Sequence, residues 1–121
     1  MCAAGLVLAV AAAHSYLGER YILIRLLRRP DLPRLFGSDV FTRRTLRLAW
    51  HLTTVVWCGV AAVLVVAASA SRMPVSLRDL GLILTVTCLA SAAVSLIISR
   101  GRHLSWVAFL AIAALCWWGT R

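Results

Sequence analysis

The sequence predicts an all-α integral membrane protein, a bundle of four transmembrane helices in a single domain. Of its 121 residues, 62% are hydrophobic and the mean hydropathy is +0.90. That is more apolar surface than a small water-soluble domain can bury. Arginine-rich or turn-like connections separate four apolar runs and leave no room for a second domain. We expect the helices at approximately residues 3–27, 43–70, 77–99 and 104–118.

The first crossing, residues 3–27, is interrupted by polar residues. Residues 3–17 alone form a run of about 15 residues, too short to span a hydrocarbon layer of ~30 Å. The helix must therefore continue through Glu19 and Arg20 before Pro30 stops it. A helical wheel at ~100° per residue places Tyr21 and Arg25 on the face of His14 and Gly18.

The second helix, residues 43–70, is the clearest crossing, because its stretch 46–70 holds one arginine, one histidine and no carboxylate. The connection before it mixes arginines with apolar residues. That composition suits either a segment lying among lipid headgroups or an ordinary basic loop. Ser38 or Asp39 is expected to cap the second helix.

The third and fourth helices have recognisable ends. Ser76 and Asp79 have the spacing of a capping box, so the third helix is expected to begin near residue 77. Gly101, between two arginines, is expected to end it. The fourth helix then follows over residues 104–118.

The arginines predict an orientation. Three of them, Arg72, Arg78 and Arg121, lie on one side, and the first and third connections with their flanks hold nine. The positive-inside rule therefore places these connections in the cytoplasm and both termini outside. Cations that are all arginine are typical of GC-rich bacterial genomes, so we expect the bacterial inner membrane. The nine are Arg25, Arg28, Arg29, Arg34, Arg43, Arg44, Arg47, Arg100 and Arg102.

The net charge of +9 would indicate nucleic acid in a soluble protein. Here most arginines flank apolar runs, so the expected partner is a bilayer with anionic headgroups, and no nucleic acid. A membrane-protein partner or a second copy of the chain is compatible with the same composition. We assign headgroup binding to Arg28, Arg29, Arg34, Arg43, Arg44 and Arg47.

Glu19 is the only carboxylate inside an apolar run, and an ionised carboxylate there is costly unless it is paired. His51 is a candidate partner because we expect it at a similar depth in the membrane, and Arg20 is a candidate because it is adjacent in sequence. Glu19 and His51 should lie roughly 3 to 6 Å apart if the polar stripes of the first three helices face one another. The predicted polar cluster consists of His14, Glu19, Arg20, His51, Thr54 and Cys58.

This cluster has two interpretations. Its residues either hold helices together, or they form a proton- or metal-handling site in which His14, Glu19 and His51 are the candidate metal ligands. Haem is disfavoured because His14 and His51 differ in depth by about 10 Å. Structural zinc is disfavoured because no Cys or His pair has ligand spacing. The sequence therefore indicates no particular cofactor and no catalytic residue.

The stretches HSYLGERYILIRLL (residues 14–27) and LPRLFGSDVFTRRTLRLAWHLTTVVW (residues 32–57) resemble an uncharacterised group of small bacterial four-helix membrane proteins. The resemblance implies the fold and a bacterial membrane but no activity. With Glu19 in its first helix, the chain is also similar to small multidrug-resistance transporters. His51, Trp57 and Gly59 resemble helices of copper-resistance membrane proteins.

We therefore expect a structural, accessory or assembly subunit rather than an enzyme. The alternative is a small proton-coupled transporter, or a metal-handling membrane protein, that uses Glu19 and His51.

Overall fold

A computed structural model describes residues 2–69 and 74–121, and the described chain is helical and contains no strand. Three of its helices are long and apolar enough to cross a membrane, and a fourth is shorter. The prediction of an all-helical protein is confirmed, and three of its helices have the length and apolar composition that a membrane crossing requires. The helical elements are α1 (Cys2–Leu17), η1 (Gly18–Leu23), α2 (Ile24–Leu26), α3 (Val40–Ser69), α4 (Leu77–Ser99) and α5 (Ser105–Gly119).

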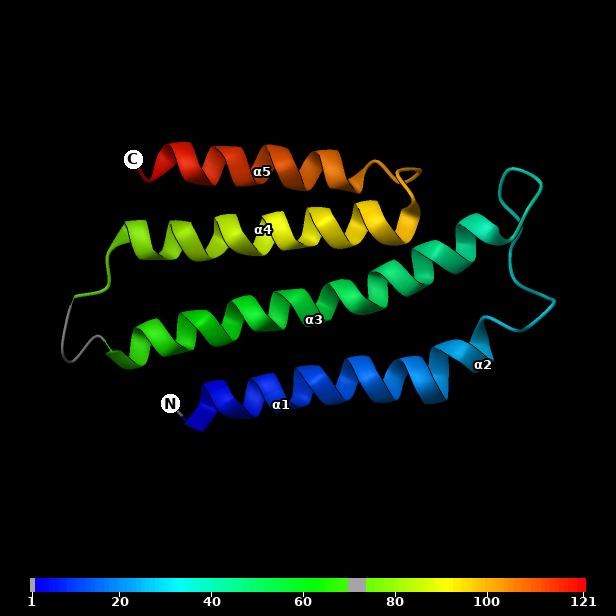
Figure 1. The fold of residues 1–121 in the computed structure, drawn as a ribbon, viewed down its shortest axis with the longest axis horizontal. Helices are drawn as coiled ribbons and strands as arrows, with labels where there is room; N and C mark the ends of the chain where they lie inside the picture. The colour runs from blue at the N-terminus through cyan, green and yellow to red at the C-terminus, as the bar shows by residue number, and fades with distance from the viewer. Residues whose placement is uncertain (1, 70–73) are drawn as a thin grey trace.

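The helices lie side by side in one layer, with α1 and α5 at its edges (Figure 1). In this layer α1 packs on α3, α3 on α4, and α4 on α5. The arrangement differs from the predicted bundle, in which the polar stripes of the first three helices face one another. The stripes of the first helix and α3 do face each other, but Ser95 in the stripe of α4 contacts α5, because a single layer has no common interior.

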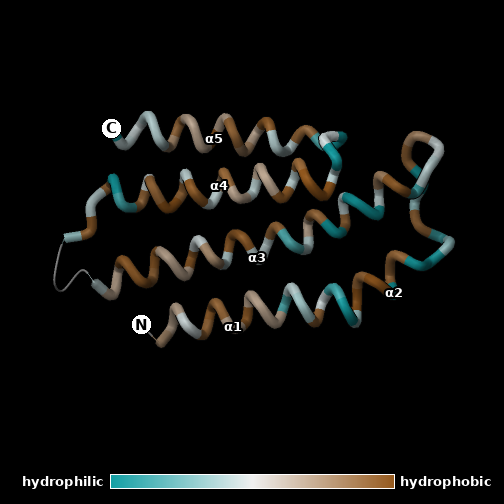
Figure 2. The backbone as a smooth tube through the Cα atoms, in the orientation of Figure 1, coloured by the Kyte–Doolittle hydropathy of each residue, from teal (hydrophilic) through white to brown (hydrophobic). Residues whose placement is uncertain are grey.

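Small residues line the contacts between helices, and large apolar residues point outward. Ala11, Ala61, Ala92 and Ala113 are buried, whereas many leucines, isoleucines and valines are exposed. This distribution is typical of helices whose solvent is lipid, since small residues let the helix backbones approach closely. Hydrophilic residues gather toward the end that holds the connections at residues 27–39 and 100–104, which we call the arginine-rich end (Figure 2).

The first helix is not a regular α-helix, because η1 is a π-helix of six residues. Gly18 and Leu23 are both buried although they are five residues apart, and Leu27 follows on the same face. A π-helix bonds residue i to i+5, so it turns less per residue than the α-helical wheel assumes. The wheel prediction for Tyr21 and Arg25 is therefore wrong, since both are exposed.

The second helix begins at Val40, earlier than predicted, and the Ser38 hydroxyl accepts a hydrogen bond from the Val40 amide at 3.2 Å. The described part of this helix ends at Ser69. Its predicted end at Ala70, and Arg72 beyond it, lie outside the described residues.

The predicted capping box of α4 is confirmed. The Asp79 amide donates to the Ser76 hydroxyl at 3.1 Å, and the Ser76 amide donates to the Asp79 carboxylate at 3.0 Å. At the other end Arg100 adopts the left-handed conformation, with φ of 52°, and Gly101 follows with φ of 76°. The α4 helix therefore ends on an arginine in the conformation that glycine adopts most easily, with glycine next.

The connection between α2 and α3 contains a tight reverse turn. Leu35 and Ser38 exchange two backbone hydrogen bonds of 3.0 and 3.2 Å around Phe36 and Gly37, whose φ angles are 56° and 77°. A left-handed conformation at a bulky residue such as Phe36 costs about 1–2 kcal/mol. The Phe36 side chain is nevertheless on the surface, and its residue is 90% exposed.

Candidate functional site

Glu19 joins α3 through two side chains. Its carboxylate forms an ion pair with the Arg47 guanidinium, with Nη2 2.8 Å from Oε1, and Oε2 accepts a hydrogen bond from Nε at 3.2 Å. The His51 Nε2 atom lies 3.2 Å from Oε2, so the pair that depth predicted is in direct contact. Arg47 and His51 are four residues apart, and this spacing places both on one face of α3.

His51 extends these contacts back to the first helix. Its Nδ1 atom lies 2.7 Å from the Ser15 hydroxyl oxygen. A carboxylate paired with arginine can only accept, so the proton on the Glu19 side belongs to His51 Nε2. We call this series of contacts, Ser15 to His51 to Glu19 to Arg47, the α1–α3 polar chain.

A second set of contacts lies beside the first, on residues close in sequence to Ser15, Glu19 and His51. The Trp50 indole Nε1 donates to the His14 carbonyl at 3.1 Å, and the two rings stack with centroids 4.5 Å apart. The His14 Nε2 atom lies 3.0 Å from the Thr53 hydroxyl oxygen. The indole also covers Gly18, where a Cβ atom would come within 2.4 Å of the ring. Glycine is required there because the ring occupies the space of any side chain.

The α1–α3 polar chain is partly open to its surroundings. The side chains of Glu19, His51 and Arg47 are 31%, 24% and 42% exposed. A cavity of about 450 Å³ adjoins the carboxylate and is lined by Glu19, Arg28, Arg43 and Arg47 with two apolar residues. An imidazole between a hydroxyl and a carboxylate can pass a proton between them. The arrangement therefore combines a helix-to-helix contact with a polar opening at the arginine-rich end.

Other predicted members of the cluster lie elsewhere. Arg20 is exposed, and the ion pairs of Glu19 are with Arg47 and His51. Cys58 lines a separate apolar cavity of about 330 Å³ between α3 and α4. The Thr54 hydroxyl is buried and has no hydrogen-bond partner among the described residues.

The three candidate metal ligands do not converge. His14 contacts Thr53 and Trp50, whereas Glu19 and His51 contact each other. Among residues 2–69 and 74–121 no group of three His, Cys, Asp or Glu side chains is arranged to hold a metal ion. In the described chain, the geometry therefore favours hydrogen bonding over metal coordination for these residues.

Ser95, in the serine stripe of α4, faces α5 and not the site. The hydroxyls of Ser95 and Ser105 are hydrogen-bonded across the α4–α5 interface. Gly81 lies against Thr120, so that a Cβ atom on the glycine would come within 2.0 Å of the threonine methyl group. This interface is built from small residues and contains no ion pair among the described residues.

Half of the arginines assigned to headgroups have an acidic partner within the chain. Arg29 contacts Asp31 and Arg43 contacts Asp39, both at 2.6 Å, while Arg47 contacts Glu19. Hydrogen bonds from these arginines hold the pKa values of Asp31 and Asp39 below their ordinary range. The other three, Arg28, Arg34 and Arg44, form no ion pair with any described residue.

Sequence reasoning missed the role of Arg47, which it assigned to lipid. The signal was present, since Arg47 lies one turn before His51 on the same stripe of α3. It also left Ser15 and Trp50 out of the cluster. Gly18 could have indicated a large neighbour, but no spacing in the sequence identifies that neighbour as Trp50.

Comparisons of the chain with protein-family models, curated proteins and solved structures found no match. The resemblance of residues 14–27 and 32–57 to a bacterial group stays a prediction. Any assignment of function therefore depends on the geometry described above.

Proposed function

We propose that this chain is a structural, accessory or assembly subunit of the bacterial inner membrane. The observation that carries the proposal is that the polar residues of the first helix are bound by the neighbouring helix. Glu19 has Arg47 and His51, and His51 has Ser15. A polar cluster that satisfies itself across an interface works as an interhelical lock, because losing one partner leaves a partly buried polar group without its hydrogen bond.

The open layer supports an accessory role. The chain's own helices cover only the sides of α3 and α4 that face their neighbours in the row. Both broad faces of the layer are left for lipid, a second copy of the chain or another membrane protein. A structural subunit needs such faces, whereas an enclosed active site would need helices around a shared interior.

The proposed topology has four crossings, cytoplasmic connections at the arginine-rich end, and both termini outside. The fourth crossing, α5, has 15 residues and so spans only ~22 Å. The bilayer can thin around a short helix at modest cost. Reporter fusions at Gly37 and Gly101 should indicate cytoplasm, and a fusion after Arg121 the opposite side. A cytoplasmic C-terminus would contradict this topology.

The lock is tested by Glu19→Gln, with Arg20→Gln as the matched control on the neighbouring residue. Losing the carboxylate leaves Arg47 and His51 without their anionic partner, so the variant should unfold more easily in detergent and accumulate less in membranes. The control changes an exposed side chain and should behave like the parent protein. Equal behaviour of both variants would contradict the lock.

A second candidate function is proton-coupled transport, favoured by the polar cavity beside Glu19 and by the imidazole contact. In that case Glu19→Gln should assemble normally but lose protection against cationic toxicants. Cells with and without the parent protein should then differ in tolerance. Equal tolerance across a panel of such compounds would exclude this function.

A further inference from the structure

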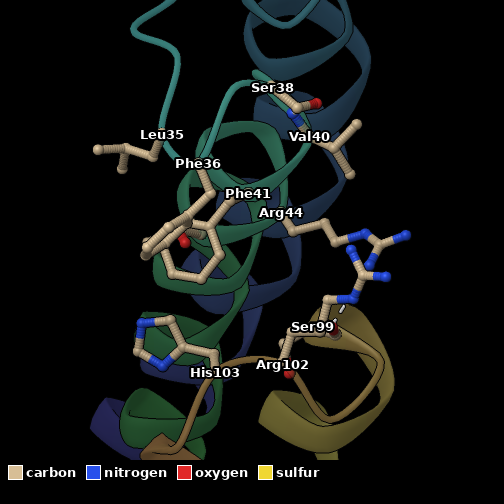
Figure 3. A pocket seen from close by; sticks show the side chains of 10 residues that line it. Leu35, Phe36, Ser38, Val40, Phe41, Arg44, Ser99, Arg102 and His103 are labelled. Atoms are coloured by element: carbon tan, nitrogen blue, oxygen red, sulfur yellow. Dashed lines mark hydrogen bonds between the residues drawn. The ribbon is translucent and has the colours of Figure 1, made fainter.

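A cavity of about 350 Å³ lies at the arginine-rich end, away from the α1–α3 polar chain (Figure 3). It is formed where the turn at Phe36, the first turns of α3 and the α4–α5 connection come together. The Phe36 ring meets Phe41 edge-on at 5.7 Å, and Phe41 stacks on His103 at 5.8 Å. These rings join the turn and the start of α3 to the α4–α5 connection, more than sixty residues away in the sequence, in one wall.

The opposite side of the cavity is cationic. Arg44 and Arg102 extend on the same side of the pocket, away from the aromatic rings (Figure 3). Neither arginine forms an ion pair with any residue in the described chain, in contrast to Arg29, Arg43 and Arg47. Two guanidinium groups beside one cavity without a carboxylate repel each other, and an anion between them would remove that repulsion.

Ser99 supplies an independent observation. It lines the same cavity, is 3% exposed, and its hydroxyl has no hydrogen-bond partner among the described residues. Its carbonyl oxygen accepts a long contact of 3.5 Å from Arg44. A buried hydroxyl without a partner is costly, and a ligand oxygen would satisfy it.

We propose that this cavity binds the phosphate group of an anionic phospholipid. Arg44 and Arg102 hold the phosphate oxygens, and the Ser99 hydroxyl donates to one of them. Leu35 and Phe36, both exposed, contact the glycerol and the first part of an acyl chain. The pairing of a cationic side with an apolar side fits a lipid better than free phosphate, which has no apolar part.

This inference uses the membrane placement proposed above, but it does not depend on what the subunit assembles with. Hydrophilic residues gather at the arginine-rich end of the layer, so the proposed membrane placement puts the cavity at headgroup depth (Figure 2). The structure also narrows the assignment made from sequence. Of the six arginines expected to bind headgroups, Arg44 alone lines this cavity, and Arg102 joins it.

The test is native mass spectrometry of the full chain in mild detergent, titrated with phosphatidylglycerol or phosphatidylcholine. Phosphatidylglycerol should be retained preferentially. Replacing Arg44 and Arg102 together by glutamine should weaken retention on the order of tenfold or more. Each arginine near a phosphate contributes a factor of about ten in affinity, or slightly less. The matched control replaces Arg25 and Arg34 by glutamine, which removes the same charge from exposed positions at the same end outside the cavity, and should weaken retention clearly less than the cavity variant does.

Three outcomes would overturn the proposal. Equal losses in the two double variants would indicate diffuse surface charge. Equal retention of phosphatidylcholine would exclude recognition of an anionic headgroup, and displacement of phosphatidylglycerol by an equal concentration of inorganic phosphate would indicate a free-anion site.

If the double variant fails to fold, Arg102→Gln alone should weaken retention severalfold, because Arg102 lies in a connection outside the helices. Ser99→Ala should weaken it further in that background.

Discussion

The α1–α3 and α4–α5 interfaces solve the same packing problem with different chemistry. The first uses an ion pair, two histidines and an indole ring, held by distances from 2.7 to 3.2 Å. The second uses serine hydroxyls and a glycine that lies against Thr120. One interface is specified by directional bonds between large side chains, and the other by close approach of backbones.

The difference shows where each interface is sensitive. Large side chains with fixed partners tolerate little change in shape, because their partners cannot follow. Small hydroxyls each contribute little, since interhelical hydrogen bonds in membranes average ~0.6 kcal/mol. Substitutions at matched positions should therefore have unequal effects on the free energy of unfolding.

The largest effect is expected for Gly18→Ala. The added Cβ would come within 2.2 to 2.4 Å of the Trp50 ring, which is held by its stack on His14 and its bond to the His14 carbonyl. Overpacking of this kind costs about 1–3 kcal/mol. Thermal unfolding in detergent, followed by tryptophan fluorescence, measures the loss. Gly5→Ala, in the same helix with nothing within 4 Å, is the control and should be neutral or slightly stabilising. Equal behaviour of the two variants would contradict the tight fit at Trp50.

A smaller effect is expected for Gly81→Ala at the other interface. Its Cβ would meet Thr120 at 2.0 to 2.9 Å, a closer approach than at Gly18. Thr120 lies just after the end of α5, however, and its hydroxyl donates to carbonyl groups of its own last turn. The end of α5 can shift, so we expect a loss of about 1 kcal/mol, at the low end for overpacking. A loss larger than that of Gly18→Ala would reverse the comparison.

The smallest effect is expected for Ser95→Ala. It removes one fully buried hydroxyl that is bonded to Ser105 and leaves the close helix contact intact. Unfolding in detergent should show a loss of ~0.6 kcal/mol, the average for such bonds in membranes. Pairing it with Ser105→Ala in a double-mutant cycle isolates the bond. A coupling above about 2 kcal/mol would mean that this interface also depends on directional bonds.

The sequence predicted what depends on local pattern. The capping box at Ser76 and Asp79 needs only neighbouring residues, and the apolar runs located the helices within a few residues. Glu19 and His51 were paired from their similar expected depth together with the polar stripes on their helices, because helices that begin at the same surface share a depth scale.

Arrangement across helices could not be read in the same way. The order of the helices in the layer depends on which helix faces pack against each other. A periodic polar stripe in the sequence does not say which neighbouring helix it will contact. Arg47 was assigned to lipid because an arginine near a membrane surface usually faces headgroups, yet Glu19 lies within its reach. The aromatic wall at Phe36 and His103 joins segments more than sixty residues apart, beyond any local signal.

The π-helical segment η1 gives the first helix one surplus residue. Gly18 and Leu23 share a face although five α-helical steps would separate them by about 140°, while four steps would leave only about 40°. A chain shortened by one exposed residue, such as Ile22, could therefore close into an ordinary α-helix and keep both Gly18 and the leucines against α3. The same deletion in the middle of α3 would rotate every later side chain by about 100°. Tolerance to a change in length is thus concentrated beside Glu19.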